Sequence, residues 1–143
     1  MIPDFNSEGY LPPGIHDCTL HELEERFTFN LKRKILFEGL IRLIHKLGSI
    51  HCKVVYIDGS FVSSKQLPSD VDVCFECAEE HWEFAILMIG DFWKDQEKFQ
   101  KEFGCNIFPS NLFTDGGGKL YYLDFFQRIK NTDIPKGILK IKL

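Results

Sequence analysis

The sequence has little that would suit a secreted, membrane-embedded or nucleic-acid-coating protein. No apolar run among its 143 residues is long enough to span a bilayer. The segment Met1–Asn6 lacks the basic and then apolar plan of a signal peptide. The five cysteines are an odd number without the dense spacing of a disulfide framework. These absences predict a cytoplasmic protein with reduced thiols and no membrane partner.

Basic charge is not in excess either. Seventeen Lys and Arg residues face 21 Asp and Glu residues, which gives a formal net charge of -4. This balance argues against a protein that coats nucleic acid and leaves room only for a local basic patch. No internal repeat or low-complexity stretch divides the chain, and its 44% hydrophobic content includes 14 Phe. We therefore predict a single domain over residues 1–143 with one apolar core.

The first part of the chain predicts an irregular arm followed by two helices. Proline and glycine punctuate residues 1–17 too often for regular structure, although apolar side chains can pack this arm along the domain. Thr19 and Glu22 have the capping-box spacing that opens a helix, which we expect to end near Phe27. Asn30 can cap a longer helix over residues 31–47.

This longer helix is predicted to be amphipathic. Its apolar residues recur at helical spacing: Leu36, Leu40, Leu43, Ile44 and Leu47. Its basic residues take the other faces: Lys32, Arg33, Arg42 and Lys46. We therefore expect the apolar stripe to pack on a sheet and Gly48 to end the helix.

The rest of the chain predicts an α/β or α+β fold. Short segments of β-branched, aromatic or alternating character predict strands over residues 53–57, 70–75, 105–109, 119–127 and 136–143. A long helix is expected from about Ala78 to Phe103, and Gly116–Gly118 is predicted to be a flexible connection. Residues 136–143 are predicted to be an edge strand. The result is a mixed sheet flanked by helices.

The most informative stretch lies between the first two of these strands. The first strand runs into a Gly59-Ser60 turn, and the second begins with Asp70 and Asp72. Alternate residues of a strand share a face, so the two carboxylates project the same way. Like charges so close are costly unless a cation lies between them. Because Mg²⁺ takes one or two carboxylates plus substrate phosphates, we predict a metal–nucleotide site.

Two other groups of residues suggest binding chemistry. Lys136, Lys140 and Lys142 either line a phosphate or acceptor surface or protect a solvated edge strand from aggregation. The spacing of Cys74 and Cys77 suggests zinc, but no second close-spaced pair of cysteines accompanies them.

The order strand, Gly59-Ser60, loop, Asp70-x-Asp72, helix and later acidic strand resembles the nucleotidyltransferase fold. This fold is shared by the DNA polymerase beta superfamily and the minimal nucleotidyltransferases of bacterial toxin–antitoxin loci. A closer resemblance, to a family of small uncharacterised bacterial proteins assigned to that superfamily, brings no known activity. It is carried by residues 2–6, 10–17, 56–62, 70–75 and 123–127.

The resemblance implies a role for each matching residue. Gly59 and Ser60 would hold the nucleotide phosphates, and Asp70 and Asp72 would hold two Mg²⁺ ions, with Mn²⁺ as the alternative metal. Asp124 would be the third acid, which binds metal and helps to activate the attacking hydroxyl. The implied reaction moves a nucleoside monophosphate from a nucleoside triphosphate, ATP in the first instance, to a hydroxyl of an acceptor protein or RNA. The implied setting is a toxin–antitoxin or phage-defence system.

Two departures from the family pattern favour a different function. The loop after Ser60 contains no Arg, so only Lys65 can supply phosphate-directed charge there, and Lys does not replace Arg in geometry. No added helical domain is present to recognise an acceptor. The alternative is a non-catalytic, antitoxin-like binding module that neutralises a partner protein. A separate alternative concerns the residues alone: Asp70 is then a loop residue, Asp72 and Asp124 are solvent-facing strand residues, and Gly59-Ser60 is an ordinary turn.

Overall fold

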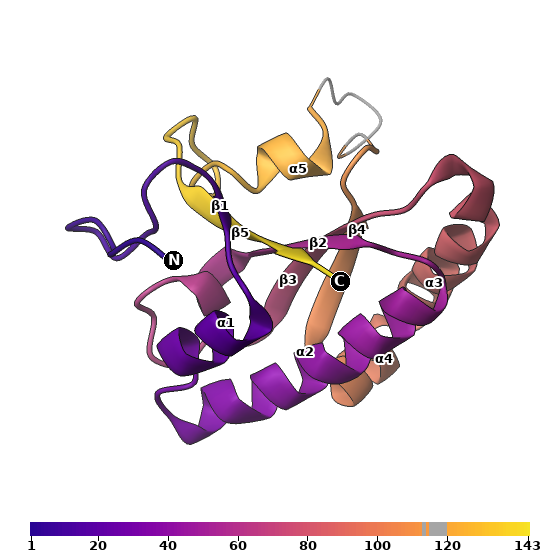
Figure 1. Cartoon of the computed structure of the whole chain (residues 1–143), viewed down its shortest axis with the longest axis horizontal. Coiled ribbons are helices and arrows are strands. Elements are labelled where there is room, and N and C mark those ends of the chain that lie inside the picture. Colours follow the sequence, from indigo (N-terminus) through magenta and orange to yellow (C-terminus); the bar gives the residue numbers. More distant parts are fainter. Residues whose placement is uncertain (113, 115–119) are drawn as a thin grey trace.

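A mixed five-stranded sheet forms the centre of the part of the chain that the computed structural model describes, residues 1–112, 114 and 120–143 (Figure 1). The strands are β1 (Gly14–Asp17), β2 (Val54–Asp58), β3 (Val71–Glu76), β4 (Cys105–Pro109) and β5 (Gly137–Lys142). Their order is β1-β5-β2-β3-β4. Strand β2 is antiparallel to β3 and β5, whereas the outer pairs β1–β5 and β3–β4 are parallel. The predicted mixed α/β class is confirmed.

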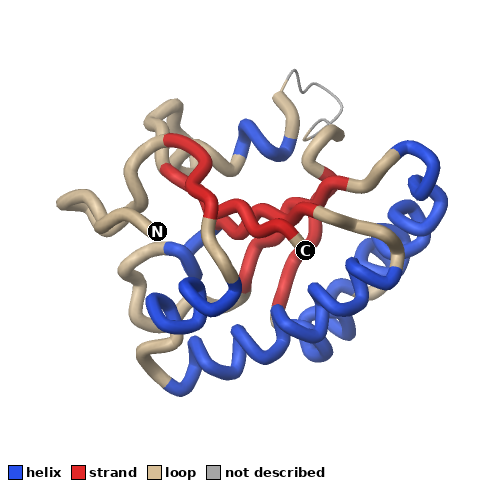
Figure 2. The backbone as a smooth tube through the Cα atoms, viewed as in Figure 1, coloured by secondary structure: helices blue, strands red, loops and turns tan. Residues whose placement is uncertain are grey.

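Helices cover one face of this sheet, and a short helix lies over the other (Figures 1 and 2). They are α1 (Leu20–Phe27), α2 (Leu31–Ser49), α3 (Trp82–Lys94), α4 (Gln96–Phe103) and α5 (Tyr122–Phe125), with 3₁₀ turns η1 (Gly59–Val62) and η2 (Glu79–His81). The main core joins α1 to α4 to the sheet, and a smaller apolar cluster joins α5 to the opposite face. No helix in the described ranges is long and apolar enough to cross a membrane.

The two predicted N-terminal helices are confirmed together with their caps. The Glu22 amide donates to Thr19 Oγ1 over 3.1 Å, and the Thr19 amide donates to the Glu22 carboxylate over 2.8 Å. Asn30 Oδ1 accepts from the Arg33 amide over 2.9 Å. The predicted apolar stripe of α2 is buried, and the helix continues through Gly48 to Ser49.

The predicted long helix over residues 78–103 is wrong in one respect, because it is two helices. Asp95 ends α3 and begins α4 with a non-helical backbone, φ -152° and ψ 83°. Its side chain accepts from the Lys98 amide over 3.0 Å. A short acidic side chain that binds a nearby amide competes with helix continuation, which is why Asp favours caps over helix interiors.

Three predictions about strands also need correction. Residues 136–143 were expected at an edge, but β5 lies between β1 and β2. The edge strand β1 comes from the arm 1–17 that was expected to be irregular. The strand expected over 119–127 is absent from the described residues 120–127, which hold helix α5, while Gly116–Gly118 and Lys119 lie outside the described residues. Whether a segment forms a strand, and whether that strand lies at an edge, depends on pairing with a distant segment. The local alternation of apolar and polar residues does not reveal this pairing.

We predict that Gly39→Ala in α2 destabilises the protein. A Cβ at residue 39 would lie 2.1 Å from the Phe103 carbonyl oxygen, a backbone atom of the last turn of α4. The helices would have to separate, at a cost of about 1–3 kcal/mol in the free energy of unfolding. Urea unfolding measures this cost.

Gly48→Ala is the matched control, because it lies in the same helix with nothing within 4 Å of the added Cβ. It should leave stability unchanged or raise it slightly, since Ala is the better helix former. Equal losses in the two variants would show that helix contact does not explain Gly39.

Candidate functional site

Three polar side chains form a row across the sheet face opposite α1 to α4. Asp58 on β2 pairs with Asp72 on β3, and Asp72 pairs with Asn106 on β4. Cross-strand partners project to the same face, and the alternating neighbours Ile57 and Val73 lie in the helix-covered core. Asn106 Nδ2 donates to Asp72 Oδ1 over 3.1 Å. Asp72 and Asn106 of this row line the floor of a cavity, and Asp58 is buried beside Asp72.

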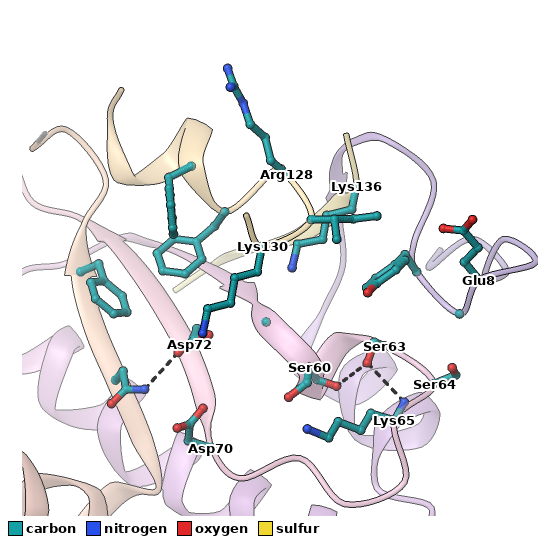
Figure 3. A pocket seen from close by; sticks show the side chains of 18 of the residues that line it. Glu8, Ser60, Ser63, Ser64, Lys65, Asp70, Asp72, Arg128, Lys130 and Lys136 are labelled. Atoms are coloured by element: carbon teal, nitrogen blue, oxygen red, sulfur yellow. Dashed lines mark hydrogen bonds between the residues drawn. The ribbon is translucent and has the colours of Figure 1, made fainter. Parts of the chain in front are cut away.

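The cavity over this row has a volume of about 810 Å³ (Figure 3). Its walls come from the N-terminal arm, the η1 loop, the start of β3, β4, α5 and the connection to β5. Its basic residues are Lys65, Arg128, Lys130 and Lys136. Figure 3 shows the Lys65 and Lys130 side chains extending towards the acids, whereas Arg128 points away from them. The cavity therefore combines carboxylates with ammonium groups.

Five of the six residues predicted for the site line this cavity: Gly59, Ser60, Lys65, Asp70 and Asp72. The sixth, Asp124, is exposed and does not line it. Asp124 was expected on a strand, but it lies on helix α5, where Tyr122, Phe125 and Phe126 share the face that lines the cavity. The structure thus separates Asp124 from the two acids that it was expected to join.

The Gly59-Ser60 turn packs its backbone directly against Asp72. Gly59 has φ +77°, and a Cβ there would lie 2.4 Å from Asp72 Oδ2. Only glycine adopts this backbone readily and allows this approach. Ser63 then stabilises the loop, because its hydroxyl donates to the Ser60 carbonyl over 2.7 Å and accepts from the Lys65 amide over 3.2 Å. The absence of a side chain at residue 59 thus lets the Asp72 carboxylate pack directly against the turn.

Arg33 binds this loop on the side that faces the helices. It is also the main residue whose position was predicted wrongly from the sequence. It was expected on a polar helix face, but it is fully buried, and burial lowers its pKa to about 10. Its guanidinium donates to five carbonyl oxygens, those of Phe27, Ser60, Phe61, Ser63 and Lys65. A planar fork with five N–H donors can satisfy such a ring of acceptors. Arg33 therefore fixes the loop that carries Ser60 and Lys65.

Asp58 is the functional candidate that sequence reasoning missed. It is 0% exposed, and neither carboxylate oxygen has a hydrogen-bond partner among the described residues. Burial raises its pKa well above the usual range, and the charge of Asp72 raises it further. In the sequence, an Asp before Gly-Ser looks like an ordinary turn residue. Only the strand register shows that Asp58 lies beside Asp72.

The environment of Asp72 also disfavours its charged form. Burial raises its pKa to about 6, and the charge of Asp70 adds to this, whereas Asn106, Lys136 and Lys130 lower it. These neighbours do not fully compensate the carboxylate, so a cation near Asp72 would be favourable.

The residues present fit a divalent cation bound together with a ligand. In the described ranges no group of three or more His, Cys, Asp or Glu side chains is arranged to hold a metal ion. Mg²⁺, however, is commonly held by one or two carboxylates plus substrate phosphate oxygens. The buried Asp58 oxygens without partners and the incompletely compensated Asp72 carboxylate at the cavity wall are the observations that support this fit.

The fold and site thus define a mixed α/β domain with a carboxylate-floored, lysine-lined cavity. A protein-family model matches residues 3–142, and the chain belongs to that family, DUF6932, a family of unknown function. No curated protein and no solved structure matches the chain. The geometry of the cavity is therefore the basis for assigning a function.

We predict that Arg33→Lys lowers the free energy of unfolding by about 2 kcal/mol or more, because several buried carbonyls lose their donor. Urea unfolding measures the loss, and hydrogen exchange should accelerate in residues 60–65. Arg42→Lys is the matched control in the same helix, since exposed Arg42 donates only to the Glu102 carbonyl in the described contacts. A loss confined to about 0.5 kcal/mol in both variants would contradict the role given to Arg33.

We also predict that stability falls as the pH rises through about 6. The pKa of Asp72 in the folded chain is about 6, above the ordinary value of 3.8. Its contribution to stability is complete below the unfolded value and is lost as the folded carboxyl ionises. The loss is at most about 3 kcal/mol, and the raised pKa of Asp58 acts in the same direction.

Urea unfolding at about pH 4 and pH 7, on either side of this window, measures the dependence. Asp72→Asn should reduce it, because the amide does not titrate, and Asp124→Asn should leave it unchanged. An identical pH dependence in the parent and in Asp72→Asn would show that Asp72 is not the titrating group.

Proposed function

We propose that the cavity binds a nucleoside triphosphate, ATP in the first instance, together with Mg²⁺ or Mn²⁺. We further propose that the protein transfers a nucleoside monophosphate from it to a hydroxyl of an acceptor protein or RNA. The observation that carries this proposal is the convergence of the Gly59-Ser60 turn, Asp70, Asp72 and Lys65 on one cavity. The carboxylates can bind a divalent cation, and the cation and the lysines can both bind negatively charged phosphates.

The residues of the turn supply the groups that would hold the phosphates. Gly59 permits close approach of the backbone, and Ser60 lies at the cavity wall, where its hydroxyl can donate to a phosphate. Lys65 and Lys130 reach towards the acids from separate walls (Figure 3). Asp70 and Asp72 would hold the metal. A bound Mg²⁺ would neutralise phosphate charge and lower the pKa of the acceptor hydroxyl.

Aromatic side chains on the opposite wall favour a nucleotide over inorganic phosphate. Phe108 and Phe126 lie with ring centroids 4.9 Å apart, and Phe125 meets Phe126 edge to face at 5.2 Å. Phe125 is 40% exposed, so part of its ring is open to a ligand. Bases stack on such rings with little dependence on their identity.

A second candidate function is a non-catalytic, antitoxin-like module that binds a nucleotide and neutralises a partner protein. The observation that favours it is the polar row itself: the residue beside Asp72 on β4 is Asn106, a neutral amide, and Asp124 lies outside the cavity. An amide oxygen binds a cation more weakly than a carboxylate does. We propose a cytoplasmic toxin–antitoxin or phage-defence setting for either function.

The test is Mg²⁺-ATP binding followed by a transfer assay. In isothermal titration the parent should bind Mg²⁺-ATP, and an Asp70→Ala, Asp72→Ala double variant should bind at least about tenfold more weakly, because the cation loses its protein ligands. Asp124→Asn is the control and should match the parent.

Each nucleoside triphosphate, labelled at the α-phosphate, is then incubated with the protein, Mg²⁺ or Mn²⁺ and bacterial lysate. Label on a discrete protein or RNA with the parent alone supports transfer. Binding without transfer favours the module. Absence of binding in the parent rules out both uses of the cavity.

A further inference from the structure

Asp58 has no partner in the folded chain that accounts for its burial. Its carboxylate is 0% exposed, and no described residue donates a hydrogen bond to either oxygen. The Cys74 thiol lies beside it, but an S–H group is a weak donor. A buried carboxyl without partners is destabilising. Such a group is better explained by a ligand than by the fold.

The strand register places Asp58 close to Asp72. The two residues are direct partners in the antiparallel pair β2–β3, so their side chains leave the same face of the sheet. The Cβ atoms of such partners are about 5 Å apart. Asp70 and Asp72 are instead two positions apart along the chain, a separation of roughly 7 Å in an extended segment. Asp58 and Asp72 are therefore the closer pair for binding one ion.

The cavity reaches this pair at Asp72. Asp72 lines the cavity, and so does Gly59, which follows Asp58 and packs its backbone against Asp72 Oδ2. Lys136 gives a second indication, because its positive charge acts on both carboxylates and the residue also lines the cavity. Asp58 itself does not line the cavity; its carboxylate is buried next to Asp72, so a cation from the cavity reaches it beside Asp72.

We propose that Asp58 is the third carboxylate of the site, the role that the sequence suggested for Asp124. Asp58 and Asp72 bind the divalent cation together from the sheet, Asp70 approaches from the loop, and phosphate oxygens of the nucleotide complete the coordination. This inference rests on the proposed function, because it requires the cavity to bind a cation and a nucleotide.

The test is Mn²⁺ binding in the presence of ATP, measured by electron paramagnetic resonance. Asp58→Asn, which keeps the shape and removes the charge, should weaken Mn²⁺ binding at least about tenfold, whereas Asp124→Asn should stay within about twofold of the parent. Without metal, the melting temperature of Asp58→Asn should equal or exceed that of the parent, which separates a lost ligand from a lost fold.

The outcomes distinguish the two proposals. If the parent binds no Mn²⁺-ATP, both the proposed function and the role of Asp58 are wrong. If the parent binds and Asp58→Asn binds equally well, only the role of Asp58 is wrong, and its carboxyl is a buried structural group. If Asp124→Asn alone loses binding, the original assignment of the third acid is restored.

A measurement on the parent chain keeps the inference testable if Asp58→Asn does not fold. Fe²⁺ with ascorbate and peroxide cuts the backbone near a bound ion. With ATP present, we expect cuts at residues 58–59 and 71–72 that excess Mg²⁺ suppresses. Cuts at 70–72 without any at 58–59, or cuts in 122–125, would overturn the role of Asp58.

Discussion

The cavity depends on one buried guanidinium. Arg33 rises from the first turn of α2, and its donors are shared among the end of α1 and the loop that follows Gly59. It also lies over the Phe29 ring at 4.4 Å. The described ion pairs include none with Arg33, so its charge is balanced by carbonyl dipoles. Because these carbonyls are held on the Arg33 side, the side chains of Ser60 and Lys65 are left to line the cavity. The buried Arg33 guanidinium on one side of the loop thus shapes the opposite surface, which is proposed to bind nucleotide phosphates.

The two sides of the turn are electrostatic opposites. On the helix side every donor of the buried charge has an acceptor, which is how a folded chain tolerates an ion in its interior. On the cavity side Asp58 has no partner and Asp72 has only Asn106 for its carboxylate among the described hydrogen bonds. The chain thus provides hydrogen-bond acceptors for the whole Arg33 guanidinium but few donors for the carboxylates of Asp58 and Asp72. Local departures of this kind concentrate where a protein binds a ligand, and stability is lost to permit them.

Local signals were sufficient for much of the fold and part of the site. Caps at Thr19 and Asn30, the stripe of α2 and the acids of β3 all follow from spacing within one segment. What failed required knowledge of a partner element. The strand β5 alternates like an edge strand, yet β1 pairs with it on the outer side. The aromatic run around Tyr122 resembles a strand, yet its side chains pack as a helix on Phe108. Arg33 and Asp58 look like surface and turn residues, because only tertiary register brings carbonyls to one and Asp72 to the other.

The choice between enzyme and binding module reduces to the number of carboxylates that reach the cation. Two acids and the ligand's phosphates are enough to retain a metal–nucleotide complex, which is all that a module needs. Activation of an acceptor hydroxyl demands more negative charge around the metal, or a base that takes the proton. Asn106 cannot supply either, and Asp124 faces solvent. Asp58 is the described carboxylate that pairs with Asp72 across the sheet, and its oxygens have no hydrogen-bond partner among the described residues. A chain that used the cavity for binding alone would gain stability by replacing it with a neutral residue, so its presence favours catalysis.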